Sequence, residues 1–227
     1  MTTTPDPQSH DPADSGPPST PTGDAVAAPG ETTALREALD GALDAPLAER
    51  LSVELREAAD PSALGRRFPA AGRRYGRGPL PGGPAGWRVE DAVRTLLLLQ
   101  APPGEVTALA GLLYRQGDAA ERRGVLRALP HLPVGDGALE LVRDALRAND
   151  PRLVEAAVGP YAARHLDQPA WRQAVLKCLF VEVPLRAVAG LAERRDAELV
   201  SLAEGLAAER LAAGRAVPAD LALIAPG

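Results

Sequence analysis

The residues best suited to binding chemistry lie in the stretch GRRFPAAGRRYGRGPLPGGPAGW, residues 65–87, which combines clustered arginines with aromatic side chains. The arginines are Arg66, Arg67, Arg73, Arg74 and Arg77, and Tyr75 and Trp87 accompany them. No acidic residue lies between Asp60 and Glu90 to neutralise this charge. Guanidinium groups hold phosphates or carboxylates through paired hydrogen bonds, and an aromatic ring beside them can stack on a planar ligand.

The prolines and glycines of this stretch predict an irregular loop rather than a helix. Three roles are open to such a loop. The loop could serve as a solvated connector, as an anion-binding loop for a small phosphorylated or carboxylated molecule, or as a docking patch for an acidic or aromatic surface of a partner. The residues alone do not choose among them.

A second polar pair stands on the segment AWRQAVLKCLF, residues 170–180. Helical spacing leaves few polar positions among apolar neighbours, so most of this helix is expected to be buried. Gln173 and Lys177 are one turn apart, and their side chains are predicted to project together into a groove or against a partner helix. The alternative is a lysine that extends its ammonium to solvent and pairs with a nearby carboxylate. Cys178, on the apolar side, is interpreted as a small core residue.

Several kinds of catalytic site find no support in the sequence. There is no nucleophile elbow, and the glycines of GRGPLPGGPAG lack the Lys-Ser or Lys-Thr ending of a phosphate-binding loop. One cysteine and three scattered histidines exclude most zinc-ligand patterns, so neither a metal nor a cofactor is predicted. His131, in the turn LPHLP, is interpreted as structural. Whether the protein is an enzyme is left open by the sequence, which favours a non-enzymatic role.

Composition favours an all-α protein that does not bind nucleic acid. Aromatic residues make up 3% of the chain and the formal net charge is -5, whereas nucleic-acid binders usually carry a basic excess. The longest apolar run, TLLLLQ, is far shorter than the roughly 20 residues that span a bilayer. Together with the single cysteine, this predicts a cytoplasmic protein without direct membrane insertion.

The chain divides into a tail and a helical domain. Residues 1–30 are rich in Pro, Ser, Thr, Asp and Gly and are expected to be disordered, and residues 31–227 form the domain. Asp118 with Glu121 predicts a capped helix start, and Asp150 before Pro151 predicts another. Gly135-Asp136 resembles a third start, and Pro160 is expected to break a helix. About ten short helices follow, arranged as HEAT-like stacked hairpins in an α-solenoid or as an irregular bundle.

From about Arg36 to Pro218 the sequence resembles the EboA family. The most specific pieces are WRVEDAVRTLLLLQ at Trp87, the helix start Asn149-Asp150-Pro151, and the helix from Trp171 to Phe180 with its VLK. The resemblance implies a bacterial protein of secondary metabolism, encoded beside a prenyltransferase-like membrane protein, a TatD-like hydrolase and a sugar-phosphate-cyclase-like enzyme, in clusters that move a metabolite or its precursor toward the periplasm or cell surface. It implies no settled catalytic activity. The segment RRFPAAGRRYGRG departs from an Ala-Pro-Arg-like stretch of relatives, so no single arginine is singled out.

The functional prediction is a non-catalytic component of a metabolite handling or trafficking pathway. It would bind an anionic small molecule or scaffold the proteins of the same gene cluster. The alternative is an enzyme or enzyme subunit of that pathway. The predicted ligand or partner site comprises the five arginines with Tyr75, Trp87, Gln173 and Lys177.

Overall fold

A computed structural model describes residues 29–224, so nearly all of the predicted tail lies outside the described residues. The described part is all-helical, as predicted, and has no strand apart from one isolated bridge between Pro79 and Arg88. Its α-helices are α1 (Pro29–Ala42), α2 (Ala45–Glu57), α3 (Pro61–Tyr75), α4 (Val89–Leu98), α5 (Val106–Gln116), α6 (Ala119–Ala128), α7 (Leu139–Arg147), α8 (Pro151–Ala157), α9 (Pro160–His165), α10 (Gln168–Phe180), α11 (Leu191–Arg194) and α12 (Ala197–Ala212). Four 3-10 helices join them: η1 (Leu129–His131), η2 (Gly135–Ala138), η3 (Leu185–Ala187) and η4 (Ala219–Leu223).

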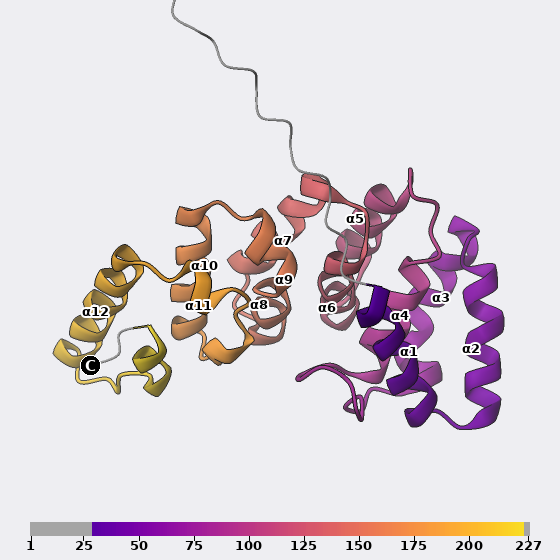
Figure 1. Ribbon diagram of the computed structural model, residues 1–227, viewed down its shortest axis with the longest axis horizontal. Coiled ribbons are helices and arrows are strands. Elements are labelled where there is room, and N and C mark those ends of the chain that lie inside the picture. The colour runs from indigo at the N-terminus through magenta and orange to yellow at the C-terminus, as the bar shows by residue number, and fades with distance from the viewer. Residues whose placement is uncertain (1–28, 225–227) are drawn as a thin grey trace, which may run out of the picture.

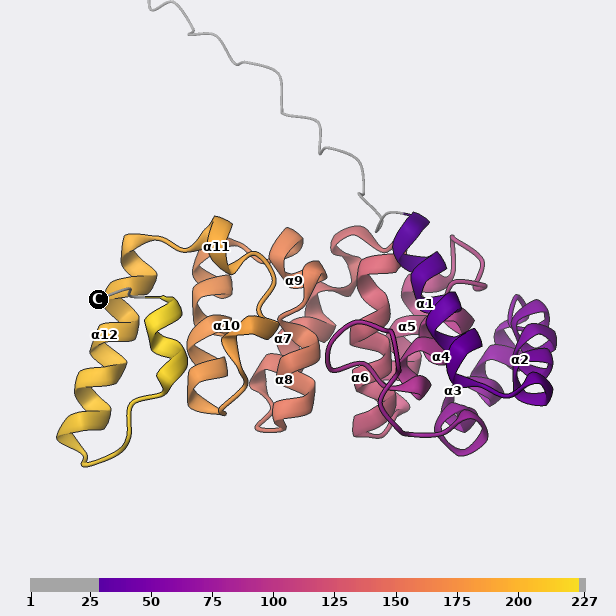
Figure 2. The ribbon, with the colours of Figure 1, turned by 60° about the horizontal axis from the view of Figure 1, so that its bottom comes forward.

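The helices follow one another along an elongated molecule. Helices α1 to α6 occupy one end, α7 to α11 the middle and α12 the other end (Figures 1 and 2). Helix α4 packs against α1, α2, α3 and α6, and α6 in turn packs against α8.

Two helix starts form as their sequences predict. Asp118 caps α6 by accepting hydrogen bonds from the backbone N–H groups of Ala120 and Glu121, at 2.8 and 2.9 Å, and Glu121 reaches back to the N–H of Asp118 at 3.3 Å. Asp150 accepts a hydrogen bond from the backbone N–H of Arg152 at the start of α8. These caps satisfy N–H groups that the first turn of a helix leaves without partners.

The predicted loop at residues 65–87 is wrong over its first half. Residues 61–75 form α3, which is capped by Asp60 through the backbone N–H groups of Ser62 and Ala63. The helix buries Leu64, Phe68 and Tyr75 at helical spacing. Burial of this apolar face outweighs the helix-breaking tendency of Pro69, which lies inside the helix.

The third predicted start also differs. Residues 135–138 form η2, and α7 begins at Leu139 without a side-chain cap. Gly135 has a positive φ of 45°, so the chain turns there instead of entering an α-helix directly. By contrast, α8 ends at Ala157 and α9 begins at Pro160, which confirms the predicted break.

A buried ionic cluster fixes α4 between α3 and α6. Glu90, Asp91 and Arg94 of α4 and Arg123 of α6 are all nearly inaccessible to solvent. The Arg123 guanidinium donates to both Asp91 carboxylate oxygens at 3.0 and 3.1 Å and to Glu90 Oε1 at 2.8 Å. Arg94 donates to the carbonyl oxygens of Phe68 in α3 and Ala120 in α6. The cluster thereby sets the position of α6, which also carries residues of the candidate site.

Candidate functional site

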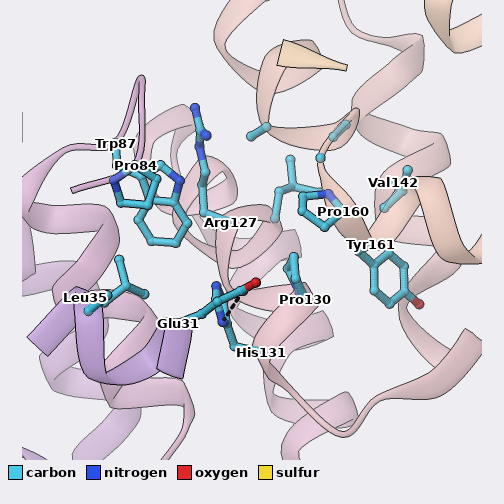
Figure 3. Close-up of a pocket in the computed structure, with 15 residues that line it drawn as sticks. Glu31, Leu35, Pro84, Trp87, Arg127, Pro130, His131, Val142, Pro160 and Tyr161 are labelled. Atoms are coloured by element: carbon cyan, nitrogen blue, oxygen red, sulfur yellow. Dashed lines mark ion pairs between the residues drawn. The ribbon is translucent and has the colours of Figure 1, made fainter. Parts of the chain in front are cut away.

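The candidate site is a cavity of about 380 Å³ where the N-terminal end of the molecule meets its middle part. Its walls come from α1, the loop before α4, the end of α6 with η1, and the junction of α8 and α9. In Figure 3, Trp87 and Pro84 lie on one side and Val142, Pro160 and Tyr161 on the other. Most of the lining side chains are apolar, and Glu31, Arg127 and His131 add charge or hydrogen-bonding capacity.

The loop before α4 holds Trp87 at the cavity. The backbone N–H of Leu80 donates to the carbonyl of Trp87 at 3.0 Å, and that of Val89 donates to the carbonyl of Gly78 at 3.1 Å. Gly86 has a φ of 77°, a left-handed conformation that glycine adopts without a steric penalty, and it turns the chain just before the indole. The loop thus presents a large aromatic side chain on a short, tied segment.

Arg127 lines the cavity from the last turn of α6. Its Nη2 donates to Glu155 Oε1 of α8 at 3.0 Å and lies 3.4 Å from the carbonyl oxygen of Gly86. The guanidinium carbon is 5.6 Å from the centroid of the Trp87 ring, which is cation–π distance. The buried Nε of Arg127 has no hydrogen-bond partner among the described residues.

His131 lies one turn beyond Arg127, in η1. It is 6% exposed, and its ring meets that of Trp87 edge to face at a centroid distance of 6.0 Å. Burial lowers the pKa of His131 below its usual value, an effect that Arg164 reinforces and Glu31 opposes. The imidazole is therefore neutral at pH 7. Its buried Nδ1 lies 3.8 Å from Glu31 Oε2, beyond hydrogen-bond distance, and makes no hydrogen bond to any described residue.

The far wall is mainly apolar. Tyr161 donates its hydroxyl hydrogen to the carbonyl of Gly135 at 2.5 Å and stacks on His165. Its ring faces the cavity while its hydroxyl points away from it (Figure 3). Ala156, Ala157 and Val142 complete this wall with small side chains that leave the cavity open.

Among the residues predicted from sequence, Trp87 is the one that reaches this cavity. Arg66, Arg67, Arg73 and Arg74 lie on α3, and Tyr75 ends that helix. Arg67 pairs with Glu57, Arg74 lies 2.6 Å from Glu54, and Arg77 lies 3.9 Å from Glu90. The acids that neutralise these three come from α2 and α4, outside the acid-free stretch.

Arg66 and Arg73 are exposed, and neither forms an ion pair with another residue in the range 29–224. Tyr75 is buried beside Glu54, and both burial and that carboxylate raise the pKa of its hydroxyl. Three of the five arginines in this segment are thus paired with acids and two are not. None of its arginines lines the cavity that holds Trp87.

Gln173 and Lys177 line a separate, more open groove, together with Leu146, Phe180 and Leu206. Lys177 Nζ donates to Asn149 Oδ1 at 2.8 Å and lies 5.7 Å from the centroid of the Phe180 ring. The helix that carries them is buried along one face, with Trp171 1% exposed and Cys178 inaccessible, but Gln173 and Phe180 are exposed, so the prediction that most of this helix is buried is wrong. The structure therefore brings Gln173 and Lys177 together but keeps them apart from both Trp87 and the arginines.

Sequence reasoning missed Glu31, Arg127 and Tyr161 and interpreted His131 only as a structural residue. The one local signal was the spacing of four residues between Arg127 and His131, which places both on one side of a helical segment. Glu31 is 100 positions away in sequence and carried no signal. Between residues 29 and 224, no group of three or more His, Cys, Asp and Glu side chains could hold a metal ion.

The cavity has the lining of a small-molecule binding site. A large apolar surface surrounds a few polar groups, and the residues that line it include no Ser, Thr or Cys. None of the helices in the described range combines the length and apolar character needed to cross a membrane.

Comparison with known proteins gives one match. Residues 81–224 match the family described as "Metabolite traffic protein EboA". No curated protein and no solved structure matches the chain significantly. The matched range includes Trp87, Arg127, His131 and the α10 helix, whereas the clustered arginines and α1 precede it. Because the match spans more than half of the sequence, this chain belongs to the EboA family.

Proposed function

We propose that this protein is a non-catalytic, small-molecule-binding component of metabolite traffic and that its ligand occupies the cavity beside Trp87. The observation that carries the proposal is an apolar cavity with two buried nitrogens, Arg127 Nε and His131 Nδ1, that lack partners among the described residues. Buried polar atoms are nearly always hydrogen-bonded in folded proteins, so two exceptions at one cavity favour a ligand that supplies the missing partners.

The size and lining of the cavity support a mainly apolar ligand. Its volume of about 380 Å³ lies within the range of roughly 300–1,000 Å³ that is typical of small-molecule sites. The Trp87 ring, edged by His131 and covered by Arg127, offers a flat surface on which a planar or unsaturated body can lie. The family's link to metabolite traffic is consistent with binding and release of such a molecule.

The helical domain is proposed to be a HEAT-like array in which the cavity lies between neighbouring helix pairs. Successive helices along the long axis of the molecule support this interpretation (Figure 2). In such an array each layer contacts mainly its neighbours and creates extended surfaces suited to recognition. This favours a carrier over an enzyme.

Scaffolding of other proteins of the gene cluster is the second candidate function. Its support is the groove on α10, where Phe180 is 63% exposed beside Lys177, and the unpaired Arg66 and Arg73 on α3. Exposed aromatic and arginine side chains are common anchors of protein interfaces. The scaffold and the carrier roles are compatible, because these surfaces lie apart from the cavity.

Binding of naphthalene probes tests the carrier proposal. Calorimetry with 2-naphthoate and 2-ethylnaphthalene should detect binding of at least one probe to the wild-type protein. Ala34→Trp, which places a large side chain into the cavity from the exposed face of α1, should weaken that binding at least tenfold. Ala208→Trp, on the exposed face of α12, is the matched control and should leave affinity unchanged.

Two results would contradict the proposal. The first is that neither probe binds to the wild-type protein. The second is that Ala34→Trp leaves the binding unchanged while both variants keep wild-type helicity and melting temperature. Conversion of the natural ligand by the isolated protein, once that ligand is known, would instead support the enzyme alternative.

A further inference from the structure

The polar side of the cavity contains a carboxylate, that of Glu31, which forms no close ion pair with another described residue. Glu31 lies in the first turn of α1, its side chain is 60% exposed, and its nearest ionic contact is with His131 Nδ1 at 3.8 Å. Figure 3 shows the Glu31 carboxylate beside the imidazole inside the cavity. This distance is too long for a hydrogen bond, so the buried Nδ1 is not satisfied by Glu31.

We propose that Glu31 occupies the position of a ligand carboxylate and that the cavity takes a carboxylic acid with an apolar, planar or unsaturated body. This inference rests on the proposed function. On binding, the Glu31 side chain moves out to solvent and the ligand's carboxylate takes its place against His131 Nδ1, which donates the hydrogen bond that the empty protein lacks.

The charges that face the imidazole agree with an anionic ligand. Arg164 of α9, whose Nη2 donates to the carbonyl of Pro130, acts electrostatically on His131, and Arg127 lies one turn before the histidine. Glu31 is the acid that opposes them at the ring, since Glu155 is already paired with Arg127. Removal of Glu31 therefore leaves a cavity whose polar end is positive.

The exchange is also sterically and energetically feasible. Because the Glu31 side chain is mostly exposed, its carboxylate can rotate into water without losing a strong hydrogen bond. The His131 ring, by contrast, is packed against Trp87 and cannot turn away to find another partner. A ligand that presents a carboxylate at Nδ1 satisfies the atom that Glu31 leaves unpaired.

The test compares 2-naphthoate with 2-ethylnaphthalene on three variants by isothermal titration calorimetry at pH 7. Glu31→Gln removes the competing negative charge and should raise the affinity for 2-naphthoate about fivefold, with less than a twofold change for 2-ethylnaphthalene. Glu37→Gln makes the same charge change on an exposed position of the same helix and should alter neither affinity by more than twofold. His131→Phe keeps an aromatic ring against Trp87 and should lower the affinity for 2-naphthoate about fivefold while sparing 2-ethylnaphthalene.

The outcomes separate this inference from the proposal on which it rests. If neither probe binds to any of these proteins, the cavity is not a ligand site and both fail. If 2-ethylnaphthalene binds but 2-naphthoate gains no more from Glu31→Gln than from Glu37→Gln, the cavity stands and the carboxylate inference is overturned. Equal losses for both probes in His131→Phe would likewise refute it, because they would indicate a packing effect.

Discussion

Replacement of Arg123 by Met tests whether the buried ionic cluster holds the N-terminal half together. Arg123 is the residue of α6 that ties both acids of α4, with three hydrogen bonds of 2.8–3.1 Å. Met matches the length of the arginine stem but has no charge. After the change, Glu90 retains Arg94 at 3.1 Å, whereas Asp91 retains only the backbone N–H of Arg88 at 3.2 Å.

The decrease in the free energy of unfolding caused by Arg123→Met has the same magnitude by two independent arguments. Removal of one partner from a buried ion pair typically costs about 3–5 kcal/mol, because the remaining charge is left without compensation. The loss has a ceiling, since Asp91 can take up a proton instead. Protonation at pH 7 of a carboxyl whose ordinary pKa is about 3.9 costs roughly 4 kcal/mol at 1.36 kcal/mol per pKa unit. We therefore expect a decrease of about 3–4 kcal/mol in the free energy of unfolding.

Protonation also predicts the pH dependence of this loss. Burial already raises the pKa of Asp91 in the wild-type protein, with Arg123 opposing the shift. Without Arg123 the pKa rises further, so the folded variant binds a proton that the unfolded chain does not bind. A raised folded pKa means that the stability of the variant increases as the pH falls. The difference from wild type should therefore shrink by roughly 2–3 kcal/mol between pH 7 and pH 5.

Urea denaturation followed by circular dichroism at pH 7 and pH 5 measures both quantities. Arg143→Met is the control, because Arg143 forms an exposed pair with Glu140 that is expected to contribute at most about 1 kcal/mol. A loss for Arg123→Met no larger than that of the control would show that the cluster does not stabilise the fold. A large loss that is independent of pH would refute the role assigned to Asp91.

Three further predictions follow from burial. Trp171→Ala should lower the free energy of unfolding by roughly 3–5 kcal/mol, because the indole is 1% exposed in the middle of the molecule; a change within half a kcal/mol in urea denaturation would place α10 on the surface. The pKa of His131 is lower in the folded protein than in the unfolded chain, so the unfolded chain takes up a proton first as the pH falls below about 6.5. The wild-type protein should therefore lose stability relative to His131→Phe in this pH range. Identical pH profiles of the two proteins in urea denaturation would contradict this. Burial raises the pKa of Cys178 to about 12, so the thiol should remain unmodified by a disulfide reagent at pH 8 until urea unfolds the protein, and rapid modification of the native protein would show that it is accessible.

Helix boundaries could be predicted from sequence where the determining contacts are local. Asp118 and Asp150 cap helices through hydrogen bonds to backbone groups two or three residues away, and Pro160 starts a new helix because it has no N–H to donate. The same reasoning failed for α3. Pro69 indicates a break locally, but Phe68 and Tyr75 are buried by other helices, and that burial keeps the segment helical.

The sequence by itself determined the helical character of the described residues and the placement of Gln173 and Lys177 along one groove, because helical periodicity places residues three or four apart on one face. Tertiary structure alone decided which charges that are far apart in the sequence meet. Arg123 joins Asp91 across 32 residues, and Glu31 reaches His131 across 100, so neither contact leaves a periodic trace in the sequence. The cavity beside Trp87 likewise exists because packing brings α1, α6 and α9 together, and only that packing separates it from the arginines of α3.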